Sequence, residues 1–126
     1  MMIGTTRQVT VHAYAKAVDM RKSFDTLSVI VKSALGRDVL SGDVFVFVGK
    51  TRRRAKVLYW DGTGLCVFAK RLEKGRFAAP WTRQKEGTLQ WTMSELSLFL
   101  EGSELVGRIA LSPEPWTPMQ RAAVVT

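Results

Sequence analysis

Residues 43–71 read DVFVFVGKTRRRAKVLYWDGTGLCVFAKR, and this stretch decides the fold. Residues 43–48 are rich in β-branched and aromatic side chains without polar alternation, which is typical of a strand covered on both faces. Residues 56–60 and 65–71 resume the strand pattern, and the DGTG turn between them favours a tight hairpin because glycine tolerates positive φ. The stretch therefore predicts three strands in an antiparallel meander, with the cationic segment GKTRRR at residues 49–54 joining the first two.

Weaker strand signals lie on either side of this stretch. Residues 8–14 (QVTVHAY) alternate apolar and polar side chains, which indicates a half-buried first strand. Residues 76–79 (RFAA) are predicted as a short fourth strand that ends at Pro80, since proline cannot donate to a ladder. Residues 82–87 follow as a polar loop, and residues 105–111 fit either a further strand or a docked segment.

Two stretches show helical periodicity. Apolar residues recur at steps of three and four from Asp19 to Leu35, with Asp19 as the predicted N-cap and Gly36 as the residue that closes the helix. Thr92 and Glu95 have the spacing at which a hydroxyl and a carboxylate cap each other's backbone, and a short apolar stripe follows them. The sequence therefore predicts one long amphipathic helix and a shorter C-terminal one.

Together these elements predict an α+β fold, in which an antiparallel β-meander of four to five strands packs against the long helix. We expect residues 1–111 to form a single domain, because a chain of 126 residues is long enough for one core. Residues 112–126 begin with SPEPWTP, whose three prolines predict an extended, mobile tail.

The positive charge is concentrated in one part of the chain. The net charge is +8, but residues 50–85 hold eleven lysines and arginines against two acids, a net of +9, so the remaining residues carry −1. Such polarity favours a polyanionic partner, with nucleic acid ahead of an acidic protein or an anionic lipid surface.

Several classes of protein are disfavoured by the composition. No apolar run approaches the length needed to cross a bilayer, and no secretion signal precedes the first strand, so we expect a cytoplasmic protein. The single cysteine, Cys66, forms neither an internal disulfide nor a structural zinc site and is predicted as a small core residue. No GxxxxGK[ST] motif occurs, and no cofactor is expected.

No catalytic constellation stands out. The only histidine, His12, is expected on the polar side of the first strand, far in sequence from Cys66. A metal-dependent nuclease would need converging carboxylates, for which Asp61 and Glu73 are the remaining candidates. Because Asp61 has a structural role in the turn, we expect no enzyme.

The basic stretch is the strongest functional signal. Exposed lysines and arginines bind phosphates by releasing counterions, and interleaved aromatic residues offer platforms on which bases stack. The alternative is a solvated sheet edge that prevents aggregation, with the aromatics in the core. The candidate nucleic-acid-binding residues are Lys50, Arg52, Arg53, Arg54, Lys56, Lys70, Arg71, Lys74 and Arg76, with Trp60 and Trp81 as candidate base-stacking residues.

The runs DMRKSFDTL at residues 19–27 and DVFVFVGKTRRRAKVLYWDGTGLCVFAKRLEKGRF at residues 43–77 resemble a known family. It is the small TnpB accessory protein, or second open reading frame product, of the insertion-sequence family sixty-six of bacterial transposons. Ser23 and Thr26 depart from it where glycine is usual, and Ala79 departs where an aromatic residue is usual. The resemblance implies a role in transposition beside a separate DDE-type transposase, which would hold the catalytic carboxylates.

Two hypotheses for the basic stretch stay open. In the first, an accessory factor of transposition grips DNA through these residues. In the second, a protein-interaction module docks the transposase, or another protein of the same element, without binding DNA. Homodimerisation through a sheet edge or the apolar tail is compatible with either.

Overall fold

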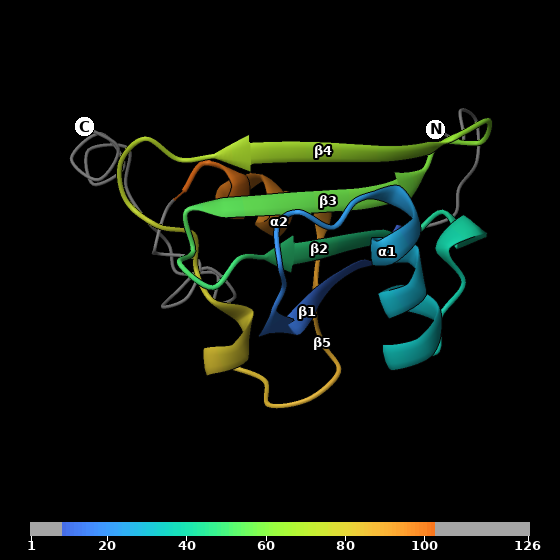
Figure 1. Ribbon diagram of the computed structural model, residues 1–126, viewed down its shortest axis with the longest axis horizontal. Helices are drawn as coiled ribbons and strands as arrows, with labels where there is room; N and C mark the ends of the chain where they lie inside the picture. The colour runs from blue at the N-terminus through green and yellow to red at the C-terminus, as the bar shows by residue number, and fades with distance from the viewer. Residues whose placement is uncertain (1–8, 103–126) are drawn as a thin grey trace.

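A computed structural model describes residues 9–102 and shows a five-stranded mixed sheet with a helix on each face (Figure 1). The strands are β1 (Val11–Ala17), β2 (Val44–Val48), β3 (Arg54–Trp60), β4 (Leu65–Arg71) and β5 (Thr88–Trp91), in the order β4-β3-β2-β1-β5. Helix α1 (Phe24–Val29) continues into a π-helical turn, η1 (Ile30–Ala34), and helix α2 (Met93–Leu100) follows β5. Two 3-10 turns, η2 (Val39–Ser41) and η3 (Pro80–Thr82), complete the described chain.

The predicted meander of three strands is present. β2 pairs with β3 from Val44↔Tyr59 to Val48↔Ala55, and β3 pairs with β4 from Arg54↔Arg71 to Trp60↔Leu65, both antiparallel. All five residues of β2 are buried, which agrees with the lack of polar alternation in its sequence.

The prediction of a purely antiparallel sheet is wrong, because β1 lies parallel to β2, with Val11 beside Val44. A parallel pair requires a long crossover connection, and the chain supplies one in the segment that contains α1 and η2. This pairing places the C-terminal end of β1 at the same end of the sheet as the C-terminal end of β2.

The two outer pieces of the sheet also differ from the prediction. Residues 76–79 are not a strand; they form an extended segment that buries Phe77 completely in the core. The fifth strand is instead β5, which pairs antiparallel with β1 and follows the predicted polar loop. The predicted further strand at residues 105–111 and the tail at residues 112–126 lie outside the described residues.

The first helix is shorter than predicted and begins at Phe24, with Ser23 as its N-cap. Asp19 does not cap it, because the Asp19 carboxylate accepts hydrogen bonds from the Arg21 backbone N–H at 2.9 Å and from Arg21 Nη2 at 2.7 Å. The Ser23 backbone N–H donates to Thr26 Oγ1 at 2.8 Å, which fixes the start of the helix. Gly36 has φ +63°, as expected of a residue that closes a helix.

The second helix begins as predicted. Thr92 Oγ1 accepts a hydrogen bond from the Glu95 backbone N–H at 3.1 Å, and Glu95 Oε1 accepts one from the Thr92 backbone N–H at 2.8 Å. These reciprocal bonds satisfy two backbone donors that the helix itself leaves without partners.

The core has two layers because the sheet is covered on both faces. On the α1 face, Leu27 and Val31 pack against Phe45, Phe47 and Leu58. On the α2 face, the strands pack against Leu72 and Phe77, which follow β4, and against Trp91 of β5. Leu96 and Phe99 of α2 complete this layer.

The prediction of a surface histidine is wrong, since His12 is only 1% exposed. Its Nε2 atom lies 3.0 Å from Asp43 Oδ2, and its ring stacks on Phe45 with the ring centroids 5.2 Å apart. The alternation of β1 suggested one solvated face, but Val11, His12 and Ala13 are all buried, so both faces of β1 are covered at this point. Cys66 is half-buried on the edge strand β4 rather than in the core.

Candidate functional site

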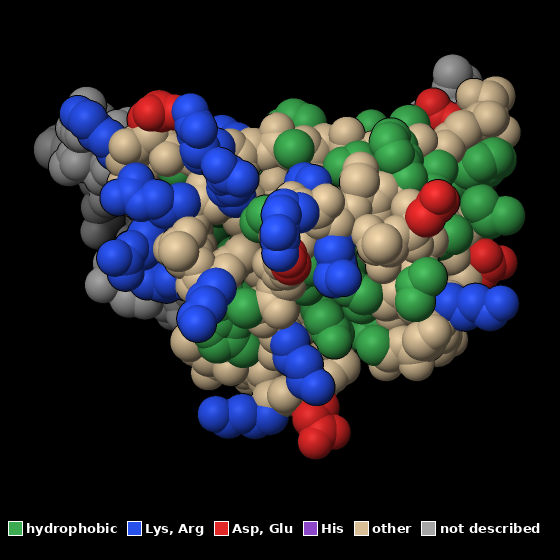
Figure 2. Space-filling model, viewed as in Figure 1, with side chains coloured by type: hydrophobic (Ala, Val, Ile, Leu, Met, Phe, Trp, Pro, Cys, Tyr) green, Lys and Arg blue, Asp and Glu red, His purple; other side chains and the backbone are tan. Residues whose placement is uncertain are grey.

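Eight of the nine cations singled out in the sequence gather at one end of the sheet, where β2 ends, β3 begins and β4 ends. Figure 2 shows lysine and arginine side chains crowded at that end. Two backbone hydrogen bonds hold its segments together, from Leu72 N to Arg53 O at 2.8 Å and from Phe77 N to Arg52 O at 2.7 Å. We call this group the basic end: Lys50, Arg52, Arg53, Arg54, Lys56, Arg71, Lys74 and Arg76.

Two arginines of the basic end face each other across the β3–β4 hairpin. Arg54 is the direct partner of Arg71 in the ladder, so their side chains lie on the same face of the sheet. Lys56, two residues along β3, shares this face. The hairpin therefore brings three cations from two strands onto one surface.

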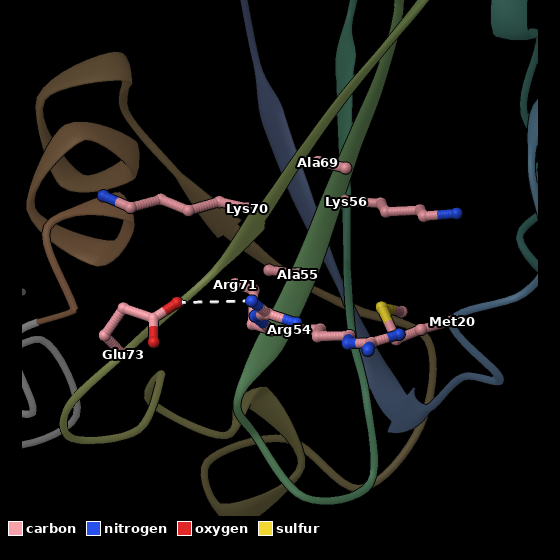
Figure 3. Close-up of a pocket in the computed structure, with 8 residues that line it drawn as sticks. All are labelled: Met20, Arg54, Ala55, Lys56, Ala69, Lys70, Arg71 and Glu73. Atoms are coloured by element: carbon pink, nitrogen blue, oxygen red, sulfur yellow. Dashed lines mark hydrogen bonds and ion pairs between the residues drawn. The ribbon is translucent and has the colours of Figure 1, made fainter.

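The ninth cation, Lys70, is directed elsewhere. Side chains alternate between faces along a strand, so Lys70 lies on the face opposite Arg71. Its Nζ atom donates to the Leu100 carbonyl oxygen at the end of α2, at 2.6 Å, and Figure 3 shows it turned toward that helix, away from Arg54. Lys70 thus satisfies a helix-terminal carbonyl.

Sequence reasoning missed one contributor to this surface, the segment at residues 20–22. Lys56 Nζ donates to the Lys22 carbonyl oxygen at 2.6 Å, although these residues are 34 positions apart. The Met20 side chain packs over Gly49, where a Cβ atom would lie 2.7 Å from Met20 Cγ. The segment reaches the basic end because β1 runs parallel to β2, which no local signal in the sequence reveals.

A pocket of about 430 Å³ lies between this segment and the β3–β4 hairpin (Figure 3). Its acidic member is Glu73, whose Oε2 lies 3.5 Å from Arg71 Nη2, with both side chains largely exposed. The lining residues are Met20, Arg54, Ala55, Lys56, Ala69, Lys70, Arg71 and Glu73.

The two candidate base-stacking residues are not placed alike. Trp60 lies at the opposite end of β3 from Arg54, and six residues of strand span about 20 Å. Trp81 lies in η3, half-buried and packed against the core. The structure therefore does not interleave Trp60 with the cations of the basic end.

The two carboxylates considered for a nuclease lie beyond opposite ends of β4 and do not converge. Asp61 belongs to the turn, where its Oδ1 accepts from the backbone N–H groups of Thr63 and Gly64, each at 2.9 Å. These hydrogen bonds lower the pKa of Asp61 to about 2. Within residues 9–102, no group of three or more histidine, cysteine, aspartate or glutamate residues is arranged to hold a metal ion.

Near the same turn, Cys66 Sγ lies 3.5 Å from Asp61 Oδ2. Desolvation raises the pKa of the Cys66 thiol, and the hydrogen bond to the Asp61 carboxylate adds to the rise. A raised pKa keeps the thiol protonated, which disfavours a nucleophilic role.

Residues 9–102 thus form a small mixed α+β domain whose cations are concentrated at one end of its sheet. In this part of the chain, no helix has the length and apolar character to cross a membrane. A family model described as IS66 Orf2 like protein matches residues 9–108. The chain belongs to this family, which is associated with IS66 transposition, and the resemblance drawn from the sequence is confirmed.

Two relatives in Sinorhizobium fredii (strain NBRC 101917 / NGR234) are similar over most of their length. The uncharacterized protein y4jC is 34% identical over 123 residues, which cover 98% of this chain and 94% of the relative. The uncharacterized protein y4hO is 35% identical over 101 residues, which cover 80% of this chain and 86% of the relative. No solved structure matches the chain significantly.

Proposed function

We propose that this protein is a non-catalytic accessory factor of transposition that contacts nucleic acid through its basic end and assists a separate transposase. The observation that supports this proposal is that eight cations from two segments gather at one end of the sheet. Among the described residues, Glu73 is the acidic residue that forms an ion pair with one of them. Unneutralised cations on a folded surface attract a polyanion and gain free energy from counterion release. Membership of a transposition family makes DNA the relevant polyanion.

The geometry favours phosphate contacts over base stacking. Lysine and arginine side chains of the basic end project from a strand pair and a loop, and Trp60 lies far from them. Phosphate contacts position a protein on nucleic acid and carry no sequence information by themselves. We therefore expect binding to DNA with weak sequence preference and strong salt dependence.

The test is binding of duplex and single-stranded DNA across a salt series, with two matched double variants. R53A/R54A removes two charges from the basic end. K32A/R37A also removes two exposed charges, but away from the basic end. Lys32 lies in η1, and Arg37 lies in the segment between η1 and β2. Each duplex phosphate contact contributes about 0.9 to the slope of log K against log salt, so R53A/R54A should reduce the slope by about 1.8.

The control variant and the wild-type protein decide the outcome. K32A/R37A should leave the slope unchanged. If both double variants reduce the slope equally, only net charge matters and the assigned site is refuted. If the wild-type protein binds neither form of DNA, the function as a DNA-binding factor is wrong. The basic end would then fit an acidic protein surface, and co-purification with the transposase of the same element would test that alternative.

A further inference from the structure

We propose that the pocket between the β3–β4 hairpin and residues 20–22 is a binding site for a single phosphate group, held between Arg54 and Arg71. The phosphate would belong to a phosphodiester of the nucleic-acid backbone, and this part of the proposal rests on the proposed function. Free inorganic phosphate presents the same chemistry and serves as the probe.

The two arginines of the pocket face each other across the β3–β4 hairpin. Arg54 and Arg71 are direct partners in an antiparallel ladder, where opposite Cβ atoms lie about 5 Å apart. Like charges in this relation destabilise a sheet, so the hairpin carries a repulsion that a bound anion would relieve. Guanidinium groups also match the geometry of phosphate oxygens, which they bind in a bidentate manner.

The charges of the pocket are not neutralised by the part of the protein that the structure describes. Within residues 9–102, Arg54 forms no ion pair with another described residue. Among the same residues, the ion pair of Arg71 is the 3.5 Å contact with Glu73, in which the side chains are 63% and 81% exposed. An ion pair this exposed and this long is weak, so Glu73 leaves Arg71 available to a stronger anion.

Contacts within the protein already hold the walls of the pocket in place. Lys56 Nζ is held at 2.6 Å from the Lys22 carbonyl oxygen, and its ammonium group has further N–H donors to offer. The ladder partner of Lys56 is Ala69, whose small side chain leaves space above the sheet. Met20, packed over Gly49, forms the opposite wall.

The size of the pocket agrees with a hydrated phosphate group. Its volume of about 430 Å³ is many times the roughly 30 Å³ that one water molecule occupies in the liquid. The phosphate and several bridging waters therefore fit together. Figure 3 shows Arg54 and Arg71 close to each other, with Arg54 extended toward Met20.

The experiment titrates the full chain with inorganic phosphate and follows its amide signals by NMR. In the wild type, the amides of Ala69 and Met20 should shift in a saturable manner. R54Q/R71Q should weaken phosphate binding at least tenfold and remove these shifts. Its matched control, K74Q/R76Q, makes the same change of charge in the basic end but outside the pocket lining, and should change the affinity less than twofold.

E73Q should change the affinity for phosphate in the opposite direction. Glu73 competes with the anion for Arg71, so E73Q should strengthen phosphate binding about twofold. The proposal is refuted if R54Q/R71Q and K74Q/R76Q lose equal affinity, or if the shifts avoid Ala69 and Met20. R54Q/R71Q removes a repulsion and is expected to fold, which its NMR spectrum will verify.

Duplex DNA titrated into the same variants separates this proposal from the proposed function. If DNA binds but R54Q/R71Q leaves the affinities for phosphate and for DNA unchanged, the pocket is not the phosphate site and the function as a DNA-binding factor stands. If phosphate binds in the pocket but DNA does not bind the protein, the site stands as a free-phosphate site and the proposed function falls. Loss of both ligands in R54Q/R71Q alone supports both proposals.

Discussion

Replacing Arg54 by glutamate should make the protein more stable, although it removes a charge proposed to bind phosphate. The substitution turns the repulsion between Arg54 and Arg71 into an attraction across the β3–β4 ladder. Two unit charges about 7 Å apart in water interact by about 0.6 kcal/mol, so reversing the sign changes the energy by up to about 1.2 kcal/mol. Solvent exposure reduces this, and we expect a gain of about 0.5–1 kcal/mol in the free energy of unfolding.

The assay is thermal unfolding at low and high salt. A gain of this size corresponds to a rise of about 3–5 °C in Tm for a domain of roughly 100 residues. The rise should shrink in 1 M salt, where the Debye length is about 3 Å. R54Q, which removes the repulsion without adding attraction, should show about half of the effect.

The matched control is R53E, which makes the same charge change one residue earlier. Arg53 precedes the first pair of the ladder and has no cation opposite it. R53E therefore reports only the effect of lowering the net charge from +8 to +6, a change of two. If R54E is no more stable than R53E at low salt, the arginines do not repel each other, and a bound phosphate would have no repulsion to relieve.

Two further predictions concern the Asp61 turn and the start of α2, both outside the basic end. The folded-state pKa of Asp61 is lowered to about 2, so its ionised form contributes stability that is fully present above pH ~4 and is lost as the pH falls toward 2. D61A should therefore be less stable than the wild type at pH 6. Its Tm should also fall less than that of the wild type between pH 5 and 2. An equally steep fall in both proteins would contradict this. T92A removes the hydroxyl that accepts from the Glu95 amide and should cost about 1 kcal/mol in urea unfolding, whereas S94A, on an exposed position of α2, should cost much less.

The sequence was sufficient to predict those elements that local signals determine. The VFVFV run and the Asp61-Gly62 turn define the meander because strand composition and turn chemistry act over a few residues. The Thr92 and Glu95 pair defines the start of α2 for the same reason. Asp19 shows the limit, since the helix has Ser23 as its N-cap and the Asp19 carboxylate binds Arg21, two residues along the chain.

Elements determined by tertiary contacts could not be predicted in this way. The direction of β1 relative to β2 depends on how the crossover packs, and β5 is a four-residue strand with few β-branched residues. The burial of His12 depends on distant side chains, because its ring stacks on Phe45 and contacts Asp43. The basic end itself was predictable as a cluster, and alternation along β4 could have separated Lys70 from Arg71, but the contribution of residues 20–22 depends on the parallel pair.

The pairing of β1 with β5 has a consequence for the order in which the sheet assembles. Val11 pairs with Trp91, 80 positions later, whereas Trp60 and Leu65 in the β3–β4 hairpin are five positions apart. Closing the longer loop costs about 2.5 kcal/mol more in chain entropy, since this cost grows with the logarithm of loop length. The hairpins should form first and β5 should join last, so during synthesis β1 waits for its outer neighbour until residue 91 has left the ribosome.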